Sequence, residues 1–210
     1  MKNYSLILEE LIQNLKITPT LLLHSCCAPC SSYVLNYLAD HFKITVLYYN
    51  PNISPIEEYE KRKQEQIRLV SEMKFKNTVN IMDCDYDHDQ FEQMAHGLEQ
   101  EKEGGARCFK CYQLRLEKTA QLAKINHFDY FGTTLTVSPY KNSQKLNEIG
   151  ALLEEEYHIP YLYSDFKKKD GYKKSIEFSK QYNLYRQNYC GCKYSKPHDF
   201  LVKEQICNQK

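Results

Sequence analysis

The sequence predicts a single α/β domain, spanning residues 1–210, in which a parallel sheet carries helices on both faces. Three observations favour this class. Short apolar or β-branched segments alternate with amphipathic ones from residue 20 onward, which is the pattern of successive strand–helix units. A chain of 210 residues can bury one sizeable core. No internal repeat, low-complexity run or linker divides it.

The first half of the chain predicts a leading helix and three strands. Apolar residues at helical spacing indicate a helix over residues 3–15. Buried strands are expected where short aliphatic and aromatic runs occur, at 20–24, 43–49 and 79–82. A helix over 31–42 has serine available as its N-cap, and Ser54-Pro55 opens a long polar helix to about residue 73.

The second half continues the alternation. Gly104-Gly105 separates an acidic helix from the next helix, which is expected to begin only after the cysteines at 108 and 111. Two further strands complete a five-stranded sheet, and Asp165 follows the second of them. The expected helices are 87–101, 112–125, 142–157 and 171–182, the strands are 130–137 and 161–163, and a loop covers 184–195.

The composition points to a cytoplasmic protein rich in thiols. The net charge of +1 excludes a strong overall attraction to polyanions, so any contact with nucleic acid must be local. The amino terminus lacks the apolar segment of a signal peptide, and no apolar run approaches the roughly 20 residues of a membrane span, so no membrane partner is expected. In a reducing compartment, clustered cysteines indicate metal or redox chemistry rather than structural disulfides.

Seven of the nine cysteines fall in three clusters. The first follows the apolar run at 21–23, in the turn after the first strand, where open α/β sheets bind their ligands. A nucleotide-binding chain would carry glycines in this turn. The sequence therefore predicts a metal site in this turn, where other chains have a phosphate loop. The candidate metal-binding segments are 24–32, 104–112 and 184–195, which contain Cys26, Cys27 and Cys30, Cys108 and Cys111, and Cys190 and Cys192.

Seven thiols exceed the four that one zinc ion or one iron–sulfur cubane needs. We therefore expect a cluster plus either a second metal or a dithiol that cycles. A zinc knuckle formed by Cys108, Cys111 and two of the first three cysteines is one alternative, and a thioredoxin-like pair is another. Spacing alone does not separate a redox pair from metal ligands at Cys190 and Cys192. Cys84 and Cys207 are expected to be structural, a buried thiol and a tail thiol.

A lysine-rich run and many tyrosines make RNA a reasonable substrate class. The run begins just after Asp165 and contains Lys167, Lys168, Lys169, Lys173 and Lys174. The 18 tyrosines offer flat surfaces for unstacked bases. A lysine run is also typical of a plain solvated face. His24 and Arg107, which flank cysteines, could donate hydrogen bonds or protons, or simply pack.

Several long motifs in the same order resemble the cobalamin-independent epoxyqueuosine reductases, the QueH family. The resemblance covers most of the chain from residue 21 to 195. It rests on HSCCAPC at 24–30, YYNPNI at 48–53, RCFKCY at 107–112, TTLTVSPYK at 133–141 and LYRQNYCGC at 184–192. Residues 1–19 and the tail after 195 carry no interpretable motif.

The resemblance implies the last step of queuosine biosynthesis, in which the epoxide of epoxyqueuosine at the wobble position of tRNA becomes the alkene of queuosine. It implies a nucleotide-hydrolase-like fold of the HUP or PP-loop type and a 4Fe-4S cluster, without cobalamin. The expected cluster ligands are Cys26, Cys27, Cys108 and Cys111, and Cys30 is the least certain thiol. Cys190 and Cys192 would form a redox pair, or ligate a second mononuclear iron completed by Asp165.

Removing an epoxide oxygen as water consumes two electrons and two protons, so a donor of ferredoxin or flavodoxin type is expected as a partner. Asp165 is favoured over Asp129 as an oxygen ligand because Asp129 precedes its strand. Two other functions fit the residues less well. They are an iron–sulfur-dependent tRNA sulfur transferase, which would be expected to need a nucleotide loop, and a non-enzymatic zinc module that binds RNA.

Overall fold

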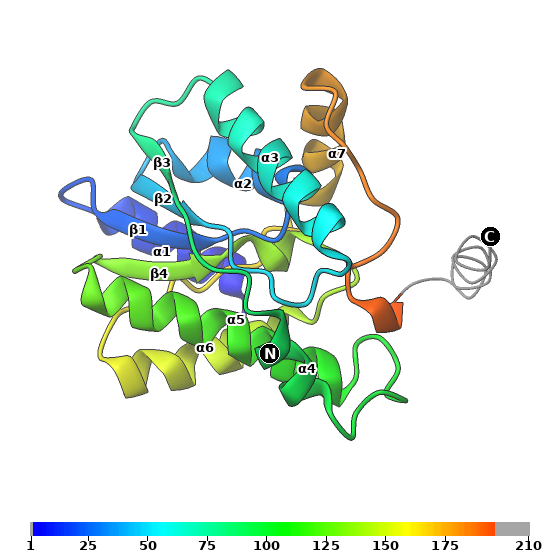
Figure 1. Cartoon of the computed structure of the whole chain (residues 1–210). Helices are drawn as coiled ribbons and strands as arrows, with labels where there is room; N and C mark the ends of the chain where they lie inside the picture. The colour runs from blue at the N-terminus through cyan, green and yellow to red at the C-terminus, as the bar shows by residue number, and fades with distance from the viewer. Residues whose placement is uncertain (1, 196–210) are drawn as a thin grey trace.

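The computed structural model describes residues 2–195 and contains a four-stranded parallel sheet (Figure 1). Its strand order is β3-β2-β1-β4, so β1 is flanked by β2 on one side and by β4 on the other. The expectation of a parallel α/β sheet is confirmed, but the sheet has four strands, not five. The strands are β1 (Thr20–His24), β2 (Lys43–Leu47), β3 (Val79–Met82) and β4 (Tyr130–Thr133).

The helices cover both faces of the sheet. Figure 1 shows α5 and α6 on one face and α2, α3 and α7 on the other. Their bounds are α1 (Tyr4–Asn14), α2 (Ala28–Leu38), α3 (Ile56–Glu72), α4 (His88–Ala95), α5 (Ala106–Ile125), α6 (Ser143–Tyr157) and α7 (Gly171–Gln181), with short 3-10 turns η1 (Thr134–Val137) and η2 (Lys193–Ser195).

The alternating side chains of β1 divide the core into two layers. Leu22 packs with residues of α5 and α6, whereas Leu21 and Leu23 pack with residues of α1 and α2. All three side chains are fully buried. A strand buried on both faces reads as a continuous apolar run, which is why the sequence predicts this element well.

The predicted fifth strand at 161–163 is wrong, since the segment forms only an isolated bridge to β4 between Phe131 and Tyr161. Leu162 N–H donates to the carbonyl of Phe131 at 2.8 Å, and the ladder then stops. The Asn147 side chain of α6 then pairs with the backbone of Ser164. Its Oδ1 accepts from Ser164 N–H at 3.0 Å, and its Nδ2 donates to Ser164 O at 2.8 Å. A side chain therefore satisfies the backbone groups that a longer strand would have paired.

Two helix starts differ from the expectations in ways that move cysteines. α2 begins at Ala28 rather than at residue 31, with Cys27 in the N-cap position and Cys30 in the first turn. α5 begins at Ala106, so Cys108 and Cys111 lie on a helix rather than on the preceding loop. The expected strand 130–137 ends at Thr133 and continues as η1, and the expected helix 87–101 ends at Ala95.

None of the helices in the described chain combines the length and the apolar character required to cross a bilayer.

Candidate metal centre

The thiols lie at the carboxyl edge of the sheet, beside β1 and β4. After β1 the chain passes through α2, on one face of the sheet, to reach β2. β4 is the other neighbour of β1, and after it the chain passes through η1 to α6 on the opposite face. Such a divergence is the topological switch point where α/β sheets form their binding crevice. The cysteine turn follows β1 directly, so it is placed at this crevice.

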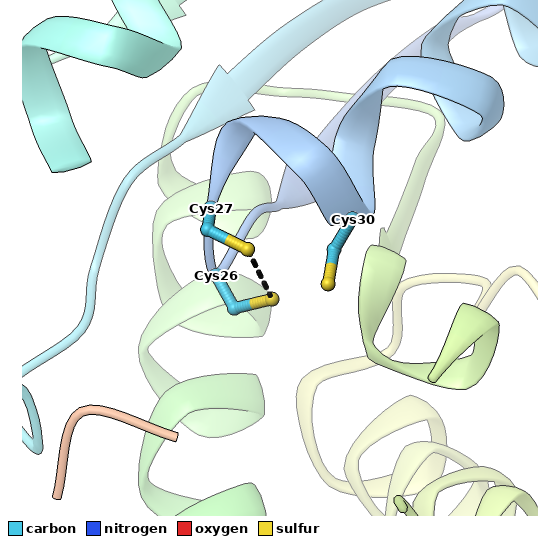
Figure 2. Close-up of side chains that lie close together, drawn as sticks. All are labelled: Cys26, Cys27 and Cys30. Carbon is cyan, nitrogen blue, oxygen red and sulfur yellow. Dashed lines mark hydrogen bonds between the residues drawn. The ribbon is translucent and has the colours of Figure 1, made fainter. Parts of the chain in front are cut away.

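Cys26, Cys27 and Cys30 converge in this turn, as Figure 2 shows. Their three Sγ atoms lie within 4.8 Å of one another, and the Sγ atoms of Cys26 and Cys27 are 3.8 Å apart. The turn is fixed from α3, where the Gln66 Oε1 accepts hydrogen bonds of 2.8 Å from both Ser25 and Ser31. Soft sulfur ligands this close together fit a thiophilic metal.

The three thiols of this turn differ in the direction of their pKa shifts. Hydrogen bonds from Cys26 and Cys30 hold the pKa of Cys27 well below its usual range. The hydrogen bond with Cys27 raises the pKa of Cys26 to about 12, and hydrogen bonds with Cys26 and Cys27 raise that of Cys30 well above normal. One thiolate therefore forms readily at the helix N-cap, and a bound metal would release the remaining protons.

A second thiol group lines a small adjoining cavity and consists of Cys108, Cys111, Cys190 and Cys192. Cys108 and Cys111 lie three residues apart on α5 and so share a helix face. Gly104 N–H lies 3.2 Å from Cys108 Sγ and donates to it. Cys190 also lines the larger cavity above Cys26, Cys27 and Cys30, so the two thiol groups adjoin each other.

The smaller cavity also presents polar atoms that lack partners. Asn52 Oδ1 and the Tyr112 hydroxyl are buried there and make no hydrogen bond within residues 2–195. All the cysteines in that range are free thiols. Because each thiolate of a cubane binds a different iron, the ligands need not be as close as those of a single ion. This donor set therefore fits an iron–sulfur cluster held between the two groups.

Cys190 and Cys192 differ in their ionisation. Burial opposes ionisation of Cys190, but Lys141 and Arg115 outweigh it and lower the pKa of this thiol. Lys141 Nζ lies 3.2 Å from Cys190 Sγ and 3.2 Å from Glu103 Oε1. Burial raises the pKa of Cys192 to about 12. Of these two thiols, Cys190 is thus the one that ionises more readily.

Asp165 and the lysine run lie apart from the thiols. Asp165 lines another cavity, with residues of α1, α2 and α7, and its carboxylate is 3.4 Å from Lys167 Nζ. Asp165 lines neither thiol cavity. Lys169 is paired with Glu9, and Lys174 Nζ lies 5.3 Å from the centre of the Tyr33 ring. Lys168 lines the same cavity as Asp165, and Lys173 is exposed.

His24 and Arg107 have structural partners. The buried His24 ring makes 3.0 Å hydrogen bonds with Thr133 Oγ1 and Tyr49 O, and burial lowers its pKa to about 3. The Arg107 guanidinium donates to three backbone carbonyls of the preceding loop, at residues 98, 99 and 101. Cys84 donates to Tyr48 O at 3.4 Å, outside both thiol cavities, and Cys207 lies beyond the described residues.

The sequence interpretation missed three charged residues at this site, Glu103, Arg115 and Lys141, all of which line both thiol cavities. A signal existed for two of them. Arg115 is one helical turn after Cys111, and Lys141 ends the TTLTVSPYK motif. Neither position shows on its own that the side chain points at sulfur.

Comparisons with known proteins agree with the geometry. The family model described as epoxyqueuosine reductase QueH matches residues 21–198. The epoxyqueuosine reductase QueH of Streptococcus pyogenes serotype M1 is 43% identical over 198 residues, which is 92% of this chain and 78% of the relative. The protein of that name from Thermotoga maritima is 34% identical over 179 residues, or 84% of this chain and 90% of the relative.

A solved structure resembles the fold at low sequence identity. It is the U34-tRNA thiolase NcsA from Methanococcus maripaludis with its [4Fe-4S] cluster. The TM-score is 0.54 at 11% identity, and the match covers 96% of this chain and 70% of that protein. At this identity the likeness supports the shared fold and nothing further.

Proposed function

We propose that this chain, which belongs to the epoxyqueuosine reductase QueH family, reduces the epoxide of epoxyqueuosine in tRNA to the alkene of queuosine, the last step of queuosine biosynthesis. The C–O bonds of the epoxide break, two electrons and two protons are consumed, and one water is released. The electrons come from a protein of ferredoxin or flavodoxin type. The observation that carries this proposal is the gathering of seven free thiols around two adjoining cavities.

Cys26, Cys27, Cys108 and Cys111 would hold a 4Fe-4S cluster, and no cobalamin is required. When bound, the cluster would supply electrons one at a time at low potential. Two thiol groups on separate elements, the β1–α2 turn and α5, favour this assignment. Cys30 is the remaining thiol of the first group, and it is available to a second iron.

Cys190 and Cys192 would act as the redox-active pair. Oxidation of two thiols to a disulfide releases two electrons and two protons, which matches the demand of the epoxide. The lowered pKa of Cys190 and the raised pKa of Cys192 support this role, because one thiol of the pair ionises more readily and the other keeps its proton. If these cysteines instead ligate a second iron, Asp165 is a poor third ligand, because it lines a different cavity.

The larger cavity, of about 520 Å³, would take the modified base after it leaves the anticodon stack. Tyr140 and Tyr172 line it and offer rings against which an unstacked base can rest. Lys141, buried next to Cys190, would donate a hydrogen bond to the developing alkoxide as the ring opens.

The lysines at 167–169, 173 and 174 are proposed to contact tRNA phosphates. Lys167 and Lys169 already face Asp165 and Glu9, so Lys168 and Lys173 are the more available of the five. Exposed lysines that bind phosphate give binding a salt dependence.

The test is nucleoside mass spectrometry of epoxyqueuosine-containing tRNA after anaerobic incubation with metal-loaded protein, a low-potential reductant and no cobalamin. We expect conversion to queuosine by the wild type, a loss of at least 100-fold in Cys190→Ser, and near-normal conversion in Cys84→Ser. Cys84 is the matched control because it is a free thiol outside both cavities.

Failure of the wild type to convert tRNA, with iron and acid-labile sulfide present and tRNA bound, would contradict the proposal and favour sulfur transfer. Zinc without sulfide in anaerobically purified protein would favour the non-enzymatic module instead.

A further inference from the structure

Arg115 is a buried cation that has no carboxylate partner. It lies on α5, one turn after Cys111, and only 1% of its surface is exposed. Its Nε donates to Cys111 O at 3.2 Å. Within residues 2–195 no carboxylate oxygen lies within 4.0 Å of its guanidinium. Two other arginines at the site are equally buried. Arg62 has Glu58 at 2.7 Å, and Arg107 donates to three backbone carbonyls and lines only the smaller thiol cavity.

A buried, unpaired charge is strongly destabilising, so its surroundings should supply negative charge. The cavities that Arg115 lines are also lined by thiols from three segments, namely Cys111, Cys190 and Cys26, and the guanidinium carbon of Arg115 lies 5.9 Å from the centre of the Tyr112 ring. Arg115 lines both thiol cavities. Lys141 lines both as well, but it is paired with Glu103 and Cys190. Arg115 is therefore the cation left to balance thiolates from both groups.

We infer that Arg115 is a positioning residue, the fixed counter-cation of the metal-bound thiolates, and that it makes the bound redox centre easier to reduce. This inference rests on the metal site of the proposed function. Reduction adds negative charge to the centre, and a permanent positive charge buried beside it stabilises that state more than the oxidised one. Arginine suits the role because its guanidinium stays protonated under all ordinary conditions.

The decisive measurement is the reduction potential of the loaded protein, obtained by anaerobic titration followed by electron paramagnetic resonance. Arg115→Met removes the charge and keeps much of the length. We expect at least a tenfold loss in the equilibrium constant for one-electron reduction, which corresponds to a potential lower by about 59 mV or more. Arg115→Lys, which keeps the charge, should stay closer to the wild type.

Arg186→Met is the matched control. Arg186 also lines the larger cavity but is exposed, so water screens its charge and the potential should change little. An unchanged potential in Arg115→Met, or an equal shift in Arg115→Met and Arg186→Met, would overturn the inference.

Arg115→Gln covers the case in which Arg115→Met fails to load metal, because glutamine can still donate to Cys111 O. Metal content that is lost in Arg115→Gln but kept in Arg115→Lys would show that the charge is needed and support the inference. Equal loss in both would assign Arg115 a packing role only and overturn it. Iron, sulfide and potential are measured without tRNA, so a wild type that fails to produce queuosine would refute the proposed function and leave this result standing.

Discussion

Replacing Gly191 by alanine should displace the two cysteines that flank it. Gly191 has φ of +104°, a region that residues with a Cβ rarely adopt. A Cβ at this position would lie 2.9 Å from both Arg62 Nη1 and Ile53 Cγ1. Arg62 does not yield easily, because its Nη1 donates to Cys190 O at 3.1 Å and its Nε to Glu58 at 2.7 Å.

The expected loss of stability follows from the backbone strain and from the steric contact of the added Cβ. Backbone strain of this kind costs roughly 1–3 kcal/mol, and overpacking a filled site costs a further 1–3 kcal/mol or so. For a combined cost of about 3 kcal/mol, the melting temperature of the loaded protein should fall by about 6–12 °C. Turnover should fall at least tenfold, since a displacement of about 1 Å at a reacting group can cost about 100-fold.

The Gly97→Ala variant separates the effect of backbone strain from the effect of steric contact. Gly97 has φ of +78°, but nothing lies within 4 Å of an added Cβ, and the residue is outside both thiol cavities. Calorimetry should show a smaller loss in Gly97→Ala, roughly 1–3 kcal/mol, and queuosine formation should be unchanged. Equal turnover in the Gly191 and Gly97 variants would refute the reasoning, because the contact with Arg62 would then have no effect on the cysteines.

Two further predictions concern the edge of the sheet and tRNA binding. Asn147→Leu leaves the buried backbone N–H and C=O of residue 164 without partners, so it should lower the free energy of unfolding by about 3 kcal/mol and the melting temperature by about 6–12 °C. Gln144→Leu, on the same helix but half-buried, should lower the stability far less. Equal losses of stability in the two variants would refute this prediction. Replacing Lys168 and Lys173 together by alanine should weaken tRNA binding and lower its salt slope by about 2, without changing the visible spectrum. Lys43→Ala, at the exposed amino end of β2, should change neither the affinity nor the salt slope. An unchanged slope in the double variant would make the lysine run an ordinary solvated face.

The sequence interpretation succeeded where local pattern decides the outcome. The apolar runs that become β1 and β2 are buried on both faces, and the cysteines that follow β1 had to lie at the carboxyl edge once the sheet was parallel. The C-x-x-C spacing placed Cys108 and Cys111 side by side whether on a loop or a helix. It did not reveal that α5 starts at Ala106, because glycine at 105 and alanine at 106 fit either choice.

The sequence interpretation failed where contacts between residues far apart in the sequence determine the structure. The segment at 161–163 has the composition of a strand, but Asn147 captures the backbone of Ser164 and stops the ladder after one bridge. The prediction for Asp165 depended on that strand, because it placed the residue at the strand's carboxyl end. In the structure Asp165 instead lines the cavity beside α1 and α2. The pairing of Lys141 with Cys190 spans 49 positions, and no local signal announces it.

The charge distribution explains how a nearly neutral chain could attract a polyanion. The net charge of +1 gives no overall field, and the lysine run is partly neutralised by acids. Four cations nevertheless line the larger thiol cavity, Arg62, Arg115, Lys141 and Arg186, against one carboxylate, Glu103. Two of them are already committed, since Arg62 pairs with Glu58 and Lys141 with Glu103. Arg115 lines both thiol cavities, which leaves Arg186 as the exposed cation at the larger cavity and, under the proposed function, the one we expect to meet a phosphate.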